Sequence, residues 1–237
     1  MHLLQFSTSH YCRKARLALG YKGCDYITEN LTPGLHALRV KPLTGLTTLP
    51  VLLLERDSPD PDAVTLEAIG DSSRILAYLE RHFPEPPLLP DDPSDRDRAL
   101  QLEDWLDESI GTATRIVYYQ YRATDGRAID PSPLSLAIIA IVRQQQGINA
   151  ASAKLAAERL DLALPWIDDR WQCRGFLVGD RPSVADLTAA ALLSPLALIP
   201  RYRDAYPALF DRIVEIHDRC NEPTPPDLGA SVAGAKA

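Results

Sequence analysis

The stretch STSHYCRKARLAL, residues 7–19, decides the fold. It follows the apolar run HLLQF (2–6) and continues as an amphipathic pattern, so we expect a strand that passes into a helix. The polar joint carries Ser9 and Cys12, three residues apart, which is the spacing of a thiol redox pair with serine in place of the first cysteine. This joint is therefore a candidate functional site as well as a candidate helix cap.

Composition and charge narrow the class of protein. The chain has 237 residues, of which 46% are hydrophobic, enough for one large domain or two small ones. Its net charge is −7 and no basic block stands out, which argues against a nucleic-acid partner. Apolar runs such as LSLAIIAIV are too short to cross a bilayer and no signal-peptide pattern opens the chain, so we expect a soluble, cytoplasmic protein without a membrane partner.

The cysteines indicate neither a disulfide framework nor a zinc site. They are widely scattered, no C-x-x-C occurs, and no Cys/His cluster has the spacing of metal ligands. A reducing compartment therefore fits, and we expect no bound metal. The four positions are Cys12, Cys24, Cys173 and Cys220.

Over residues 1–83, stretches with the two-residue period of strands alternate with stretches with the period of helices, in the order β-α-β-α-β-β-α. This order predicts a thioredoxin-like domain. A linker rich in proline and acidic residues follows over 84–94. The expected strands are 2–6, 26–31, 49–55 and 64–69, with a polar turn RDSPDPDA between the last two; the expected helices are 12–20, a poorly marked one at 34–41 closed by Pro42, and one that starts with Asp71 and Ser72.

Helical patterns dominate residues 95–221, so the predicted fold class is α/β plus all-α, with a frayed tail over 222–237. Ser183 and Asp186 have the spacing of a capping box ahead of a nearly all-apolar helix. Steps of three and four predict one buried stripe made of Leu102, Leu106, Ile110, Ala113 and Val117.

Four stretches in this order resemble the cytosolic glutathione transferase superfamily: STSHYCRKARLAL, TTLPVLLLE, IGDSSRILAYLE and FLVGDRPSVADLTAA. The resemblance covers roughly residues 2–220. It implies that Ser9 takes the place of the catalytic serine and holds the glutathione sulfur as a thiolate. Cys12 takes the second position of the redox motif, where a small packed thiol is the plainer interpretation.

The resemblance also implies a glutathione site. Leu49 and Pro50 match the cis-proline turn, whose backbone pairs with the cysteinyl part of glutathione, while Asp71 and Ser72 match the pair that binds the γ-glutamyl end. Each also has a plain reading, as a strand start and a helix cap. The cation for the glycine carboxylate is not placed by the motifs; the candidates are His36, Arg39 and Lys41. The possible electrophile site comprises His10 in the loop at the rim, together with Tyr118, Tyr119 and Tyr121.

The resemblance therefore implies a transferase of the detoxification type, a homodimer that joins glutathione, as cosubstrate, to a small hydrophobic electrophile without metal or prosthetic group. Two alternatives stay open. One is a glutathione-dependent thiol transferase or peroxidase that uses Cys12. The other is a non-catalytic module that binds a ligand or a protein, because one fold hosts several functions.

Overall fold

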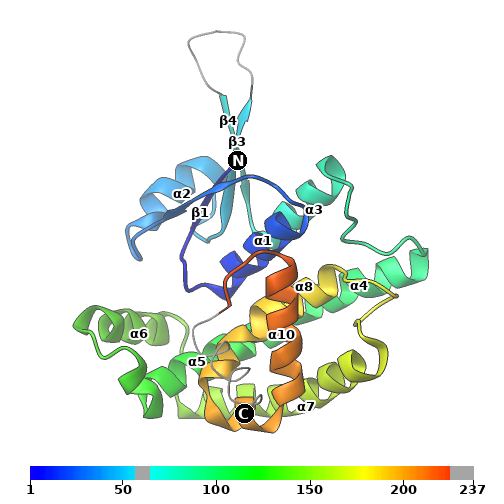
Figure 1. Cartoon of the computed structure of the whole chain (residues 1–237). Coiled ribbons are helices and arrows are strands. Elements are labelled where there is room, and N and C mark those ends of the chain that lie inside the picture. Colours follow the sequence, from blue (N-terminus) through cyan, green and yellow to red (C-terminus); the bar gives the residue numbers. More distant parts are fainter. Residues whose placement is uncertain (57–64, 225–237) are drawn as a thin grey trace. The chain divides into compact units, whose positions relative to one another are not determined.

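The computed structural model describes residues 1–56 and 65–224. They form two compact units: Met1–Leu88 with Arg219–Glu222 makes the first, and the second is built from Leu89–Asp218 (Figure 1). Most of the turn predicted at RDSPDPDA and most of the predicted tail lie outside the described residues. Over the described ranges, every helix is too short or too polar to cross a membrane.

The first unit is a four-stranded mixed sheet in the order β2-β1-β3-β4. β1 runs parallel to β2 and antiparallel to β3, and β3 is antiparallel to β4. Helices α1 and α3 pack together on one side of the strands, and α2 lies on the other (Figure 1). The predicted order is confirmed, with these elements: β1 (His2–Gln5), α1 (His10–Tyr21), β2 (Ile27–Asn30), α2 (His36–Thr44), β3 (Val51–Arg56), β4 (Thr65–Gly70) and α3 (Ser72–His82).

The apolar runs of the sequence form the two central strands. Leu4, Val51 and Leu53 are at most 5% exposed and pack with Val40 of α2 in one cluster. Because β1 and β3 are covered on both faces, they appear in the sequence as continuous apolar runs rather than as strict alternations.

Helix α2 does not end at Pro42, as the sequence predicted. It continues to Thr44 and ends at Gly45, whose left-handed φ of 76° allows its N–H to bond back to the Lys41 carbonyl. Proline removes one helical donor, the bond to the carbonyl of Leu38. The helix is exposed along this side, so that carbonyl can turn to water.

A short C-terminal segment, residues 219–222, belongs to the first unit. A Cβ built on Gly20 of α1 would lie 1.8 Å from the carbonyl oxygen of Cys220, so only glycine permits this approach. The buried guanidinium of Arg16 reaches the carboxylate of Glu222 at 2.7 Å. Backbone contact and ion pair together hold the segment against α1.

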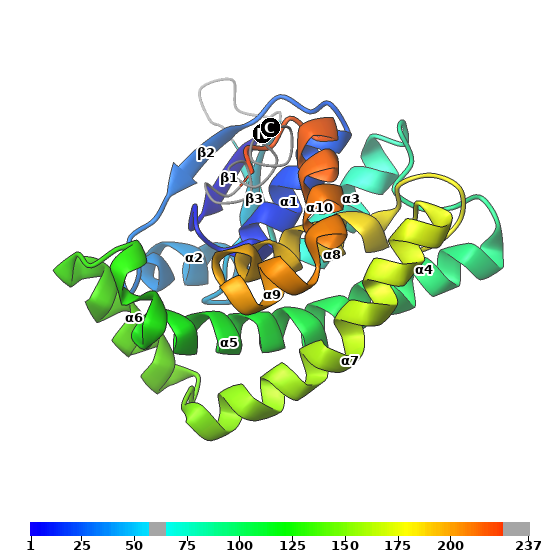
Figure 2. The same cartoon turned by 60° about the horizontal axis from the view of Figure 1, so that its bottom comes forward.

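Among its described residues the second unit contains helices and loops but no strand, as predicted. Figure 2 shows α4, η1 and α5 as one long rod with α7 alongside. The elements are α4 (Pro93–Trp105), the π-helical turn η1 (Leu106–Gly111), α5 (Thr112–Ala123), the 3₁₀ turn η2 (Asp125–Ile129), α6 (Pro133–Gln145), α7 (Ala150–Arg174), α8 (Val184–Leu193), the 3₁₀ turn η3 (Ser194–Leu198), α9 (Pro200–Ala205) and α10 (Pro207–Arg219).

The stripe predicted along the rod is buried only in its middle. Leu106, Ile110 and Ala113 are at most 1% exposed, whereas Leu102 and Val117 are half-buried. A π turn bonds residues five apart, so the face that points inward rotates where η1 interrupts the α-helical repeat. The two ends of a stripe predicted from regular helical spacing, Leu102 and Val117, are therefore not fully buried.

Helix α8 is buried at all ten of its residues. Its capping box is confirmed: Asp186 accepts hydrogen bonds from the backbone N–H and the hydroxyl of Ser183, both at 2.9 Å. The same carboxylate accepts from the indole of Trp171 at 2.8 Å and the N–H of Leu177 at 2.9 Å. Burial raises the pKa of Asp186, and these donors oppose that shift.

Candidate functional site

The strand register brings the three predicted glutathione-site segments to one end of the first unit. Leu4 pairs with Val51, and Val51 pairs with Gly70. Because β3 is antiparallel to both neighbours, the chain enters β3 at the end of the sheet where it leaves β1 and β4. The polar joint after β1, the proline turn before β3 and the first turn of α3 therefore meet at that end.

Ser9 is the N-cap of α1. Its Oγ accepts the backbone N–H of Cys12 at 3.3 Å, and its own N–H donates to the Phe6 carbonyl at 3.0 Å. The side chain is half-buried. A hydroxyl carries one donor besides its acceptor lone pairs, and the cap uses only a lone pair. Capping and donation to a ligand atom are therefore compatible at Ser9.

The residues just after Ser9 point into the protein. Cys12 is fully buried, and burial raises the pKa of its thiol, although a hydrogen bond with Ser9 opposes the shift. His10 is 7% exposed, and its ring lies 4.5 Å from that of Tyr11. His10 was expected in the loop at the rim; it is instead the first residue of α1, because Ser9 already caps the helix.

Asp71 caps α3 in a strained conformation. Its φ is 79° and its ψ 135°, a region that residues other than glycine rarely occupy. Oδ1 accepts the backbone N–H groups of Ser73 at 3.0 Å and Arg74 at 3.1 Å. The second carboxylate oxygen bonds to none of the described residues, and the side chain is exposed. Ser72, 3% exposed, follows as the first helical residue.

A buried lysine, which no sequence pattern singled out, lies beneath this helix start. Lys14 of α1 is fully buried, and its Nζ donates to the hydroxyl of Ser73 at 3.0 Å. A lysine is almost never fully buried unless it is paired. The available signal was its position four residues before Ala18, which places it on the inward face of α1.

The Leu49–Pro50 peptide is cis, as predicted. Leu49 is partly buried and packs against the cluster of Leu4, Val40 and Val51. The residue is thus fixed by packing immediately before β3.

Of the three cations considered for the glycine carboxylate, two are already engaged. Both ring nitrogens of His36 lie within 3.2 Å of backbone groups, and Arg39 pairs with Glu29 at 2.6 Å. Lys41 is exposed, and its ammonium contacts no hydrogen-bonding or charged partner among residues 1–56 and 65–224.

The candidate tyrosines all lie on α5 of the second unit and are half-buried. Tyr118 accepts a hydrogen bond from Arg122 at 3.0 Å, and its ring meets that of Tyr119 edge to face. Burial raises the pKa of Tyr119. The ring of Tyr121 packs so closely on Gly126 that a Cβ there would lie 2.6 Å from it. All three rings therefore have packing partners within their own unit.

We see no group of potential metal ligands in the part of the chain that the structure describes. There, no three His, Cys, Asp or Glu side chains lie close enough to share an ion. The groups at the sheet end are a hydroxyl, a carboxylate and the backbone N–H groups of two helix starts, which suit an anionic or zwitterionic ligand.

Comparison with known proteins identifies the family of both units. The family models "Glutathione S-transferase, N-terminal domain" and "Glutathione S-transferase, C-terminal domain" match residues 3–87 and 103–211. A glutathione S-transferase of Methylobacterium radiotolerans, solved in complex with glutathione sulfonate, is 25% identical, with a TM-score of 0.66 over 98% of this chain and 93% of that one.

Two curated relatives carry other names. FtsZ-localized protein A of Caulobacter vibrioides is 30% identical over 77% of this chain and 71% of its own length. A stringent starvation protein A homolog of Pasteurella multocida is 33% identical over 44% of this chain; the chain spans about half of that relative, 47%. By both of its family-model matches, the chain belongs to the glutathione S-transferase superfamily.

Proposed function

We propose that the protein is a glutathione transferase in which Ser9 activates the glutathione thiol. The observation that carries the proposal is the pairing of Leu4 with Val51 and of Val51 with Gly70, which gathers the three segments of a glutathione site at one sheet end. A small anionic peptide laid across that end meets two helix starts and the backbone before β3.

Ser9 would act by donating a hydrogen bond from its hydroxyl to the thiolate sulfur. A free thiol has a pKa of about 8.5, so only a few per cent is ionised at neutral pH. A hydrogen bond to a charged acceptor contributes about 1.5–3 kcal/mol, equivalent to about one or two pKa units. The positive end of the α1 helix dipole would stabilise the thiolate by a further, smaller amount. The thiolate then attacks the electrophilic carbon: a carbon–sulfur bond forms, the bond from that carbon to its leaving group breaks, and the group departs with the electron pair, as chloride does from chlorodinitrobenzene.

The start of α3 would hold the γ-glutamyl end. Oδ1 of Asp71 is occupied by the cap, and the exposed second oxygen can accept the ammonium of glutathione. The N–H and hydroxyl of Ser72 can take the carboxylate, as helix starts do for anions. The buried ammonium of Lys14, bonded to Ser73, adds positive charge beneath this turn.

The rest of the ligand would lie along β3. The backbone of Leu49 would pair with the cysteinyl part in the manner of an added strand, with Pro50 shaping the turn. Lys41 is the proposed partner of the glycine carboxylate, because His36 and Arg39 are engaged elsewhere.

The second substrate is proposed to be a small hydrophobic electrophile. Tyr118, Tyr119 and Tyr121 remain the candidate apolar surface for it, with His10 retained as a further candidate. A cytoplasmic homodimer is the proposed form of the enzyme, on the family resemblance.

The redox alternative depends on Cys12, and its surroundings oppose that use. A nucleophilic cysteine is partly exposed and has a lowered pKa. Cys12 is fully buried, and burial raises its pKa. These observations favour a packing role for this thiol.

The test is conjugation of glutathione to a chlorodinitrobenzene electrophile by the Ser9→Ala protein. We expect the rate to fall by about one to two orders of magnitude, since about 1.4 kcal/mol is tenfold in rate. Thr8→Ala, an exposed neighbour in the same joint, is the matched control and should keep the native rate. A native rate in Ser9→Ala, with a fold confirmed by circular dichroism, would refute the role of Ser9.

A non-catalytic role is the second candidate, favoured by the names of the two curated relatives. It predicts a protein that gives no conjugation with a panel of electrophiles. Chromatography on immobilised glutathione distinguishes two kinds of non-catalytic protein. A retained protein still binds glutathione, and a protein that is not retained has lost the ligand site.

A further inference from the structure

The guanidinium of Arg16 connects the C-terminal segment of the first unit with the joint that carries Ser9. Its Nε donates to a carboxylate oxygen of Glu222 at 2.7 Å, its Nη1 to the side-chain oxygen of Gln5, and its Nη2 to the backbone carbonyl of Ser7 at 3.4 Å. Arg16, Gln5 and Glu222 are each at most 8% exposed. A planar group bonded through all three of its nitrogens is fixed in both position and rotation.

Helical geometry explains why a residue inside α1 reaches the residues that precede the helix. Arg16 lies about two turns along α1 from the cap Ser9. Side chains on a helix tilt towards its N-terminus, so the long side chain of Arg16 extends towards the joint.

The carbonyl that Arg16 holds belongs to a tight turn. Ser9 donates its N–H to the Phe6 carbonyl at 3.0 Å, which closes a turn with Ser7 and Thr8 in its middle. Because a peptide is planar, a fixed Ser7 carbonyl fixes the whole peptide between Ser7 and Thr8, and with it the direction in which the turn presents Ser9. The place of the Ser9 hydroxyl therefore depends on a contact that comes from outside the joint.

Glu222 supplies the negative charge that keeps the guanidinium in place. Of the three groups that accept hydrogen bonds from Arg16, only this carboxylate is charged. Removing one partner of a buried ion pair leaves the other charge uncompensated, which is strongly unfavourable. Without Glu222 we expect Arg16 to turn towards water, and this movement breaks its bond to the Ser7 carbonyl.

We propose that Glu222 is a positioning residue for the activation of the glutathione thiol: through Arg16 it fixes the turn that carries the Ser9 hydroxyl. The inference rests on the proposed function, because it concerns the same hydroxyl. A misplacement of about 1 Å can cost about 10²-fold in rate. Glu222 lies 206 residues after Arg16, so the far end of the described chain takes part in a site formed near its beginning.

The test is the pH dependence of conjugation by the Glu222→Gln protein. Glutamine keeps the size of the side chain and an oxygen that can accept from Arg16, but it removes the charge. We expect the apparent pKa of the bound thiol to rise by about one unit, so that the rate falls about five- to tenfold at neutral pH and recovers at alkaline pH. Calorimetry should give native affinity for glutathione, because the start of α3 is unchanged.

The direction of the shift separates positioning from a simple effect of charge. Loss of a carboxylate leaves the joint more positive, and positive charge lowers the pKa of a nearby thiol. Burial raises the pKa of the Cys12 thiol in this joint, for example, and the charges of Arg16 and Arg13 oppose the shift. A displaced Ser9 hydroxyl instead raises the pKa of the bound thiol. A native or lowered value in Glu222→Gln would therefore overturn the proposal.

Glu80→Gln is the matched control for loss of stability. Glu80 pairs at 2.5 Å with Lys22, which is about as buried as Arg16 but lies at the other end of α1. This variant should keep the native pH profile. A shift as large as that of Glu222→Gln would show that any weakening of the unit moves the profile, and would overturn the proposal.

Two further measurements cover a variant that folds poorly and a protein that does not conjugate. Arg16→Met combined with Glu222→Met should fold, since apolar replacement of a buried ion pair is often neutral for stability, and should show the same rise in the thiol pKa. Hydrogen exchange over residues 6–12 should be faster in Glu222→Gln and native in Glu80→Gln. Unchanged exchange in Glu222→Gln would overturn the positioning alone. A native rate in Ser9→Ala would refute the proposed function, and this inference with it.

Discussion

Replacing Asp71 by glycine should make the protein more stable and, at the same time, a poorer binder of glutathione. Asp71 holds a φ of 79° that glycine adopts freely and an aspartate adopts at a cost. Strain of this kind persists where a conformation serves a function. A substitution that relieves strain and removes function together would identify the position as such a site.

The expected gain in stability is small and positive. Relief of a strained residue returns about 1–3 kcal/mol. The greater freedom of glycine in the unfolded chain costs about 0.5–1 kcal/mol, and replacing an aspartate cap by glycine costs a few tenths of a kcal/mol. The free energy of unfolding of Asp71→Gly should therefore rise by about 1 kcal/mol. Urea unfolding measures this directly.

The loss in binding comes from the missing carboxylate. A hydrogen bond between charged groups contributes about 1.5–3 kcal/mol, so glutathione should bind roughly 10- to 150-fold more weakly by calorimetry. Asp71→Asn is the matched control, because asparagine keeps the capping oxygen and tolerates a positive φ. It should match the native stability and still lose most of the affinity.

Two outcomes would refute the reasoning. If Asp71→Gly is less stable than the native protein, the conformation is not strained in the way the dihedral angles indicate. If it is more stable but binds glutathione with native affinity, the strain has no connection with the ligand, and the start of α3 is only a cap.

Three further changes test separate features. Cys12→Ala should leave conjugation unchanged with a modest packing cost, and an inactive variant would favour the redox alternative. Gly20→Ala, which inside a helix ordinarily stabilises by about 0.5–1 kcal/mol, should here destabilise, because its Cβ would meet the carbonyl of Cys220; a rise in the urea midpoint would contradict the packing. Asp186→Ala leaves several buried donors without an acceptor, and each costs about 1–3 kcal/mol. The free energy of unfolding should therefore fall by more than about 3 kcal/mol. A fall below about 1 kcal/mol in a urea titration would contradict this account of the cap.

The elements that follow strong local patterns could be predicted from the sequence. The runs LPVLLLE and HLLQF form the two central strands, because short apolar runs of this length suit strands that are covered on both faces. The helix starts at Ser9 and Asp71 were found because capping residues are a local signal. Those starts also carry the proposed glutathione site, so most of that site was accessible without coordinates.

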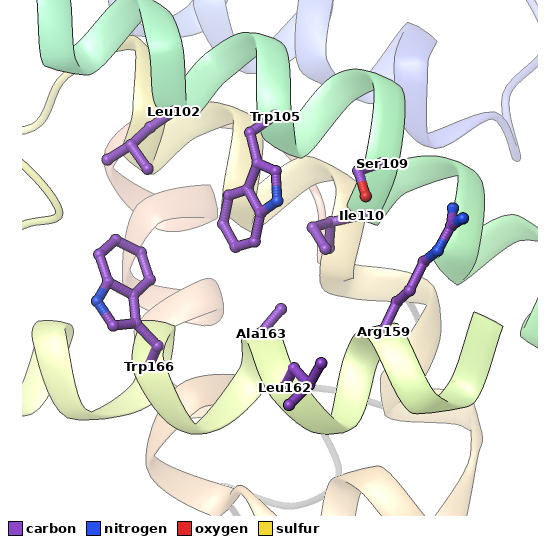
Figure 3. A pocket seen from close by; sticks show the side chains of 8 residues that line it. All are labelled: Leu102, Trp105, Ser109, Ile110, Arg159, Leu162, Ala163 and Trp166. Carbon is purple, nitrogen blue, oxygen red and sulfur yellow. The ribbon is translucent and has the colours of Figure 1, made fainter. Parts of the chain in front are cut away.

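The features that depend on distant partners or on helix register were not predicted. Lys14 appears as an ordinary charged residue until α3 is laid over it. The π turn η1 was not predicted, because the apolar residues over 102–117 are spaced by three and four and therefore also fit an uninterrupted α-helix. The edge-to-face contact of Trp105 with Trp166 (Figure 3) joins residues about 60 positions apart in the sequence, and no pattern in a single sequence specifies which helix faces meet.

The buried pair of Arg16 and Glu222 has a consequence for how the chain is made. About 134 residues separate the end of the first unit's main segment at residue 88 from Glu222, and a ribosome needs roughly 7–27 s to add them at about 5–20 residues per second. Throughout that interval the guanidinium of Arg16 can donate to the Gln5 side chain and the Ser7 carbonyl, but the carboxylate that neutralises its charge has not yet been synthesised. A buried charge without a counter-ion is strongly unfavourable. We therefore expect the first unit to complete its structure only after α10 has left the ribosome, although its strands emerge first.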